Sequence, residues 1–137
     1  MRVRRATPDY AAPISRLLFE LTGHGRPPGA VAATIAYGGE HVLVAEQDGS
    51  VIGVAGLQVH QMLHQDRPVA RLTVLVVDPA HRRQGAGEAL LEQVMDRARR
   101  ADCSGVELTT ATHRAEAHRF YQSHGFTTTS FKFWRAT

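Results

Sequence analysis

The feature that most constrains this chain is a junction between an apolar run and an amphipathic segment. The run at residues 72–79 is nearly continuous in apolar side chains, as in a central strand covered on both faces, and it ends at Asp78-Pro79. Apolar residues then recur at helical spacing over residues 89–95. Between the two lies the basic, glycine-containing turn Arg82–Gly87. The junction therefore predicts a buried strand, a tight turn and a long helix.

The turn has the composition of a phosphate-binding site. Its glycines let a ligand approach the backbone closely. The unpaired N–H groups of a helix's first turn, with the positive end of the helix dipole behind them, attract anions. Arg82 and Arg83 add positive charge at the same place. We therefore expect a phosphate group to bind at this turn.

Length and composition are those of one globular domain. The chain has 137 residues, of which 43% are hydrophobic and 21% charged, so we expect residues 1–137 to form a single domain. Cys103 is the one cysteine, and it cannot form an internal disulfide. We expect it to be a small, partly buried residue after a helix. The charged segment Met1–Arg5 leads into no apolar core of a signal peptide, and no apolar run is long enough to cross a membrane, so a cytoplasmic protein is expected.

The positive charge does not predict nucleic-acid binding. Formal net charge is +3, and Lys132 is the only lysine among 16 basic residues. These residues form no block with interleaved aromatics. The arginines at 97, 99 and 100 fall in the last turns of an expected helix, where they complement its dipole. The eight histidines lack the tight spacing of a metal site, so no metal is expected.

Periodicity and turn residues predict the element order β-α-α-β-β-β-α-β-α-β. Gln47-Asp48-Gly49 has the composition of a hairpin turn, and Gly125 that of a helix C-terminus. Hairpins in the first half and crossovers in the second predict an α/β fold with one mixed sheet and helices on both faces. Strands are expected at residues 2–5, 41–46, 50–59, 69–77, 106–111 and 126–134, and helices at 7–21, 29–37, 85–101 and 114–124.

Two common phosphate-binding patterns do not fit the turn. A P-loop requires a lysine and then a hydroxyl residue after its glycine, whereas Glu88 follows Gly87. A dinucleotide-binding fold requires a third glycine where Leu90 stands, and a parallel sheet. Both alternatives are therefore disfavoured.

Two motifs resemble those of the GNAT N-acetyltransferases. Arg82, Gly85 and Gly87 match the family's pyrophosphate loop, Gln/Arg-x-x-Gly-x-Gly/Ala. The segment Ala117–Phe126 is similar to the family's A-x-x-F-Y-x-x-x-G-F pattern. The motifs stand in the family's order, and the resemblance extends over essentially the whole chain. It implies a single GNAT-like domain in which the fourth and fifth strands splay apart at a bulge.

The resemblance implies acetyl-coenzyme A as the donor and the residues that hold it. Backbone N–H groups of the turn would bind the pyrophosphate, and the backbone of the fourth strand would pair with the pantetheine arm. Arg83 is a candidate partner for a coenzyme phosphate, or else a solvated surface residue. The family often has an asparagine where Arg114 stands, so its contact with the coenzyme stays open. The implied binding residues are Val76, Val77, Arg82, Arg83, Gln84, Gly85, Ala86, Gly87, Glu88, Arg114 and Ala117.

Acetyl transfer to an amine requires a proton for the departing thiolate and a way to remove a proton from the amine. Tyr121 stands where the family carries its general acid, and a phenol with a pKa of about 10 is protonated at pH 7. It could instead pack the helix against the sheet. Thr73 and Val74 occupy places where many relatives carry a carboxylate, so the base is open among Glu107, Glu46, His60, His64 and water.

The resemblance implies an N-acetyltransferase that moves an acetyl group to a primary amine of a small molecule by direct attack in a ternary complex. The sequence is similar to GNATs that act on aminoglycosides and aminoalkylphosphonates, and Arg67 and Arg71 are candidates to receive an anionic acceptor. Two alternatives stay open, a non-catalytic acyl-CoA sensor and a protein or peptide N-acetyltransferase. A homodimer through the aromatic C-terminal strand, with Phe131, Phe133 and Trp134 at the interface, is also expected.

Overall fold

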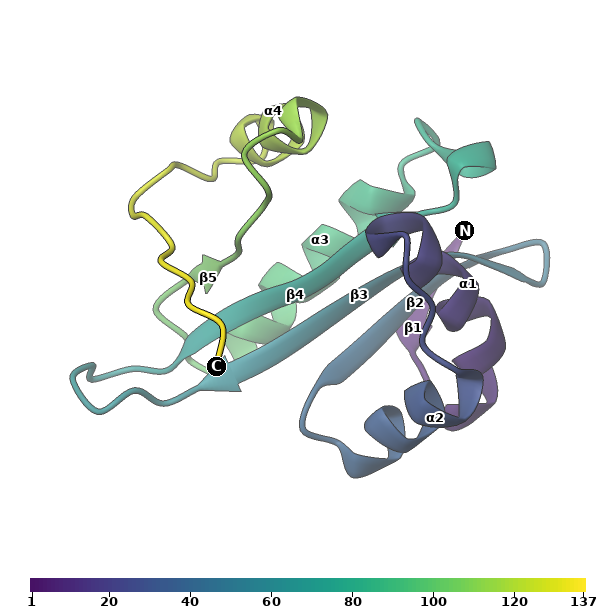
Figure 1. Cartoon of the computed structure of the whole chain (residues 1–137), viewed down its shortest axis with the longest axis horizontal. Coiled ribbons are helices and arrows are strands. Elements are labelled where there is room, and N and C mark those ends of the chain that lie inside the picture. The colour runs from purple at the N-terminus through teal and green to yellow at the C-terminus, as the bar shows by residue number, and fades with distance from the viewer. The chain divides into compact units, whose positions relative to one another are not determined.

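The computed structural model describes residues 1–137, which divide into two compact units, Met1–Glu107 and Leu108–Thr137. The first unit contains every strand of the chain, and the second contains one helix (Figure 1). The elements in chain order are β1 (Arg2–Arg5), the short 3-10 helix η1 (Pro8–Tyr10), α1 (Ala11–Thr22), α2 (Pro28–Tyr37), β2 (His41–Gln47), β3 (Ser50–His60), β4 (Val69–Val77), η2 (Pro79–His81), α3 (Ala86–Arg100), β5 (Val106–Glu107) and α4 (Ala115–Ser123).

The strands form one mixed sheet, as predicted, and their order within it is β1-β2-β3-β4-β5. The first three pairings are antiparallel, and β4 and β5 are parallel. The β2–β3 hairpin turns at Asp48 and Gly49, whose φ angles are 52° and 78°. Positive φ at both central residues of a two-residue turn matches the twist of the flanking strands. The predicted hairpin is confirmed.

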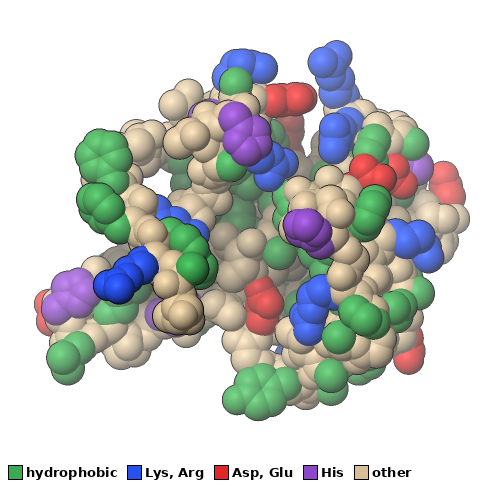
Figure 2. All heavy atoms as spheres, in the orientation of Figure 1, with side chains coloured by type: hydrophobic (Ala, Val, Ile, Leu, Met, Phe, Trp, Pro, Cys, Tyr) green, Lys and Arg blue, Asp and Glu red, His purple; other side chains and the backbone are tan.

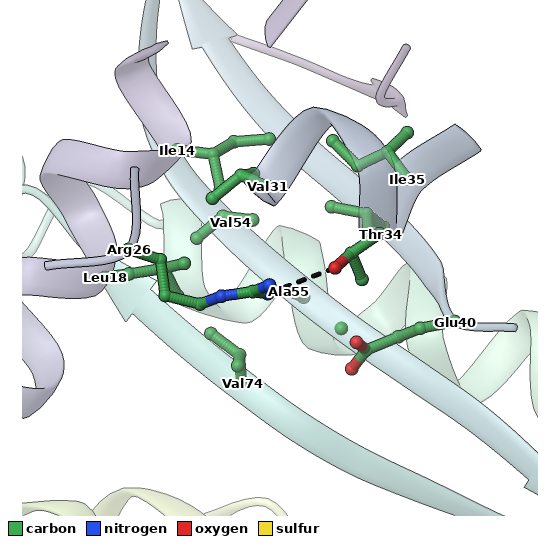
Figure 3. Close-up of a pocket in the computed structure, with 12 residues that line it drawn as sticks. Ile14, Leu18, Arg26, Val31, Thr34, Ile35, Glu40, Val54, Ala55 and Val74 are labelled. Carbon is green, nitrogen blue, oxygen red and sulfur yellow. Dashed lines mark hydrogen bonds between the residues drawn. The ribbon is translucent and has the colours of Figure 1, made fainter. Parts of the chain in front are cut away.

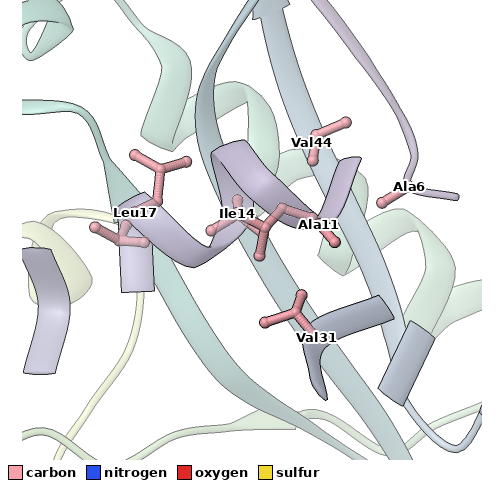
Figure 4. Close-up of a cluster of buried hydrophobic side chains, with 8 residues drawn as sticks. Ala6, Ala11, Ile14, Leu17, Val31 and Val44 are labelled. Atoms are coloured by element: carbon pink, nitrogen blue, oxygen red, sulfur yellow. The ribbon is translucent and has the colours of Figure 1, made fainter. Parts of the chain in front are cut away.

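Helices cover both faces of the sheet, as predicted. Val44, Val54 and Val76 are register neighbours on three adjacent strands and therefore share one face. The helices α1 and α2 cover that face (Figure 4), and the buried cluster there consists of Ala6, Ala11, Ile14, Leu17, Val31, Val44, Val54 and Val76. On the opposite face α3 approaches β3 closely, because a Cβ at Gly53 would stand 3.0 Å from Leu90 Cδ1.

A β-bulge interrupts β4. Gly56 pairs with Val74 and Leu57 pairs with Leu72, so Thr73 is an extra residue on β4. Beyond the first two residue pairs, Ala70 with Val106 and Arg71 with Glu107, β5 no longer pairs with β4. The two strands therefore part as predicted, and the rest of β4 has no strand neighbour on that side.

Two predicted strands differ from the structure. The strand expected at 106–111 has only two residues, Val106 and Glu107, and the strand expected at 126–134 is absent. Threonine and aromatic residues favour strands only where a neighbouring strand and a buried face exist. The second unit has no strand with which they could pair, and Phe131, Phe133 and Trp134 are almost fully exposed. The prediction of a strand at residues 126–134 is therefore wrong.

The helices are too short or too polar to cross a membrane. On the face drawn in Figure 2, basic and acidic side chains are interspersed.

Candidate functional site

The turn between β4 and α3 begins with a capped 3-10 helix. A carboxylate oxygen of Asp78 accepts a hydrogen bond from the backbone N–H of Ala80 at 3.0 Å. The other carboxylate oxygen lies 3.7 Å from Nδ1 of His81. The chain then leaves η2 in an extended conformation at Arg82, with φ −68° and ψ 156°. These contacts determine the direction in which the chain enters the glycine-containing turn.

The backbone of the turn has two residues in the left-handed region. Arg83 has φ +64° and Gly85 has φ +87°. Positive φ is uncommon for a residue with a Cβ, and such strain concentrates at ligand-binding sites. A Cβ at Gly85 would find open space, with its nearest atom, the Cε of Met1, at 3.9 Å. Glycine is therefore required there by backbone conformation and not by crowding.

The turn presents unpaired N–H groups at the start of α3. Gly85 is the N-cap residue and provides no side-chain cap. The first hydrogen bond of the helix runs from the N–H of Ala89 to the carbonyl of Gly85, at 3.0 Å. The N–H groups of Ala86, Gly87 and Glu88 therefore have no acceptor in the helix. The side chains of Arg82, Arg83 and Gln84 are exposed beside them. This arrangement fits a pyrophosphate, because its oxygens accept hydrogen bonds and its charge opposes the helix dipole.

The last residues of β4 have one free edge. Val76 and Val77 pair with Val54 and Gly53 on the β3 side. On the other side β5 has already ended. The side chain of Val76 is buried in the core, so its backbone is the part that remains available to a ligand. An extended chain such as a pantetheine arm could add to this edge as a strand does.

In the second unit, α4 carries the other predicted site residues on one face. Arg114 is the N-cap residue, and Ala117 and Tyr121 follow at spacings of three and four residues. The ring of Tyr121 packs edge-on against Phe120 and Phe126, with centroids 5.4 and 5.6 Å apart. Burial raises the pKa of the Tyr121 phenol above its usual 10, and the charge of Arg114 opposes this shift. The phenol is therefore protonated at neutral pH and able to donate.

The predicted end of α4 is confirmed. Gly125 has φ +90°, and its N–H donates to the carbonyl of Gln122 at 3.2 Å. The N–H of Phe126 donates to the carbonyl of Tyr121 at 3.1 Å. The Phe-Tyr and Gly-Phe parts of the second motif are thus joined within one compact turn, in which Tyr121 also has a packing role.

Of the side chains considered as bases, the two glutamates are held in ion pairs. Glu46 accepts a hydrogen bond from the Tyr10 hydroxyl at 2.5 Å and pairs with Arg4 at 3.3 Å. Glu107 lies 3.5 Å from Arg71. Both carboxylates therefore connect neighbouring elements of the first unit, where their charges are already matched.

The two histidines considered as bases are exposed, His60 as the last residue of β3 and His64 in the connection between β3 and β4. His60 is at the end of β3, with its Nε2 3.1 Å from Oε1 of Gln58, and His64 is exposed in the loop. Arg67, from the same connection, donates to the carbonyl of Cys103 at 2.9 Å and pairs with Asp102 at 3.4 Å. Cys103 follows α3 as predicted but is buried rather than partly buried, and this burial raises the pKa of its thiol.

A carboxylate that sequence analysis missed lies in a cavity beneath α1 and α2 (Figure 3). Glu40 precedes β2, and its Oε1 accepts a hydrogen bond from the hydroxyl of Thr73 at the bulge. No motif marks Glu40, because only the register shift of β4 brings Thr73 to this face. The cavity has a volume of about 180 Å³ and is lined by Ile14, Leu18, Arg26, Val31, Thr34, Ile35, Glu40, Val42, Val54, Ala55, Gly56 and Val74.

The fold and the turn together define an α/β domain with unpaired N–H groups at a helix N-terminus, at the free end of a central strand. The solved structure of a proposed acetyltransferase from Agrobacterium tumefaciens has the same fold, with a TM-score of 0.89 and 26% sequence identity over the full length of both chains. The model of the "Acetyltransferase (GNAT) family" matches residues 11–126. The chain belongs to the GNAT family of acetyltransferases.

Two curated relatives are similar in sequence. The aminoalkylphosphonate N-acetyltransferase of Salmonella typhimurium is 34% identical over 96 residues, which are 70% of this chain and 62% of that protein. Human N-acetyltransferase 8 is 39% identical over 95 residues, 66% of this chain and 40% of the relative. The chain thus covers less than two thirds of the length of either relative.

Proposed function

We propose that the protein is an acetyl-CoA-dependent N-acetyltransferase that acts on a primary amine of a small molecule by direct attack in a ternary complex. The observation that carries this proposal is the turn before α3, where the left-handed Arg83 and Gly85 precede three N–H groups without acceptors. Membership of the GNAT family supports it independently. We also propose that both units form one acetyltransferase domain, since the family match extends over both.

The residues of the first unit would hold the donor. The N–H groups across Arg82–Glu88 would bind the pyrophosphate, and the backbone of Val76 and Val77 would pair with the pantetheine arm. When bound, acetyl-CoA supplies an activated thioester. In the second unit, Arg114 and Ala117 are proposed as further coenzyme contacts, on the same helix face as Tyr121.

Tyr121 is proposed as the acid that protonates the leaving thiolate. Its raised pKa keeps the phenol protonated throughout the neutral range. A general acid of this kind contributes about 10²- to 10⁴-fold to the rate. The phenolate left behind is more basic than an ordinary one, so it readily takes a proton back from solvent.

A small-molecule amine is proposed as the acceptor because of the Salmonella relative, which acts on aminoalkylphosphonates. The expected homodimer and cytoplasmic location stay predictions. The exposure of Phe131, Phe133 and Trp134, at 90%, 92% and 82%, supports the former, because a soluble chain rarely leaves three large apolar side chains so exposed in one segment.

The test is a thiol-release screen with acetyl-CoA and a panel of primary amines, including small acidic amines, aminoglycosides and peptide N-termini. We expect amine-dependent release, and we expect Tyr121→Phe to lower kcat by about 10²-fold or more while the Kd for CoA stays unchanged. Tyr37→Phe is the matched control, because Tyr37 is exposed on α2.

A second candidate function gives a different result in the same screen. Thr73 and Val74 stand where many relatives carry a carboxylate, which favours a non-catalytic acyl-CoA sensor. Tight CoA binding without thiol release for any amine would establish the sensor and overturn the enzyme. Equal turnover of wild type and Tyr121→Phe at every pH would remove Tyr121 as the acid.

A further inference from the structure

The cavity beneath α1 and α2 contains two opposite charges that do not pair with each other. Arg26 and Glu40 are the only ionisable side chains that line it, and the rest of the lining is mostly apolar. Figure 3 shows both side chains extending into the same space from different segments. Neither takes part in any ion pair of the chain. A cavity with separated positive and negative groups matches a ligand that carries the opposite charges at its two ends.

The backbone of two strands positions the carboxylate of Glu40. The bulge turns Thr73 toward the cavity, where its hydroxyl donates to Oε1 of Glu40. Gly56, opposite the bulge, leaves the room that this contact needs, because a Cβ there would lie only 2.5 Å from the same oxygen. The carboxylate of Glu40 therefore lies beside Thr73, at a position where β4 itself has no carboxylate. Its other oxygen, Oε2, remains free to accept a hydrogen bond from a ligand.

The guanidinium of Arg26 is held on the α2 side of the cavity. Its Nη1 donates to the hydroxyl of Thr34 at 3.1 Å, and its Nη2 donates to the carbonyl of Ala30 at 3.4 Å. Thr34 is itself oriented by a hydrogen bond to that carbonyl at 3.1 Å. A guanidinium has five donors in a planar fork. The remaining donors of Arg26 suit a carboxylate, a phosphonate or a phosphate.

We propose that this cavity binds the acceptor amine as a zwitterion, with the anionic group on Arg26 and the ammonium group on Glu40, and that Glu40 is the base of the reaction. This inference rests on the proposed function. The ammonium group gives one proton to Oε2 of Glu40, and the neutral nitrogen attacks the thioester carbonyl carbon. The C–N bond forms, the C–S bond breaks, and the thiolate takes up a proton as in the proposed function. The second proton of the nitrogen goes to solvent, as does the proton on Glu40.

The substrate class therefore consists of small primary amines that carry an acidic group. The test uses 2-aminoethylphosphonate and β-alanine, which differ in the anion, and propylamine, which has none. We expect the wild type to prefer both acidic amines in kcat/KM. Arg26→Ala should lower kcat/KM for them about tenfold or more and leave propylamine unchanged, because a hydrogen-bonded charge pair is lost. Arg26→Lys keeps the charge and should restore part of the preference.

Glu40→Gln should lower kcat about 10²-fold for all three amines, because glutamine can accept the hydrogen bond of Thr73 but takes up no proton. Its thermal unfolding temperature should match that of the wild type, which shows that the fold is kept. The matched controls are Glu92→Gln and Arg99→Ala, at exposed positions of α3 on the opposite face of the sheet. Calorimetric titration of 2-aminoethylphosphonate gives a readout besides turnover, and binding should be weakened by Arg26→Ala.

Titration of every variant with CoA separates this inference from the proposed function. If CoA binds and amines are acetylated, but Arg26→Ala keeps the preference for acidic amines, the zwitterion site is refuted while the enzyme stands. Full kcat in Glu40→Gln would likewise exclude Glu40 as the base. If the wild type binds no CoA but binds 2-aminoethylphosphonate through Arg26, the proposed function fails and the binding site stands.

Discussion

A substitution at Gly85 tests whether the turn before α3 holds the coenzyme. Gly85 has φ +87°, and the space around its Cα is open, since a Cβ added there would lie 3.9 Å from its nearest atom. Gly85→Val therefore introduces no clash at its Cβ, and its effect arises from the backbone. A β-branched residue is strongly disfavoured at positive φ, and no surrounding contact holds the valine there. We expect the turn to relax into another conformation.

The expected loss of affinity follows from this strain. The left-handed conformation costs an L-residue about 1–2 kcal/mol relative to glycine. To bind the pyrophosphate on the N–H groups of Ala86, Gly87 and Glu88, the coenzyme must restore the conformation at the expense of its own binding energy. An energy of about 1–2 kcal/mol weakens the Kd by about 5- to 30-fold, and a β-branched side chain should bring the loss to the upper end of this range or beyond.

The assay is calorimetric titration with CoA, combined with urea unfolding to show that the variant is folded. The matched control is Gly49→Val in the β2–β3 hairpin, where φ is +78° and the space is also open. This control should lose stability and keep its affinity for CoA. Wild-type affinity in folded Gly85→Val would refute the assignment of this turn to the pyrophosphate.

Two further predictions concern stability. Leu90 is fully buried between α3 and the sheet, so Leu90→Ala should lower the free energy of unfolding by about 2–5 kcal/mol, as measured by urea unfolding. Leu63 is exposed, and Leu63→Ala should change the free energy of unfolding by no more than about 0.5 kcal/mol in the same measurement. Burial raises the pKa of the Tyr121 phenol above 10 in the folded state, so ionisation of the phenol opposes folding. The stability that the protonated phenol contributes is intact below pH 10 and is lost as pH rises through the folded-state pKa. Tyr121→Phe should therefore lose less stability than the wild type between pH 9 and pH 11, and an equal loss would show that the ring is not buried in solution.

Features that depend on neighbouring residues could be predicted from the sequence. Asp48-Gly49 predicted the hairpin because few residues adopt positive φ in succession. Helical spacing after Gly85 predicted α3, and the glycines of the turn predicted its open backbone. The positive φ of Arg83 was not visible, because arginine has no preference for that conformation.

Features that depend on partners distant in the chain could not be predicted in this way. Residues 126–134 have the composition of a strand but have no neighbouring strand to pair with in their unit, so composition alone misled.

Glu40 was missed for the converse reason, since nothing in its local sequence distinguishes it from a loop residue. The hairpin, the glycine-containing turn and the helix after it follow from local backbone preference and hydrophobic periodicity, which act over a few residues. The place of Glu40 beside Thr73 follows from the register of β3 against β4 and from one extra residue in the pairing. Register is determined by how whole strands pack, so the cavity and its two charges arise only in the folded chain.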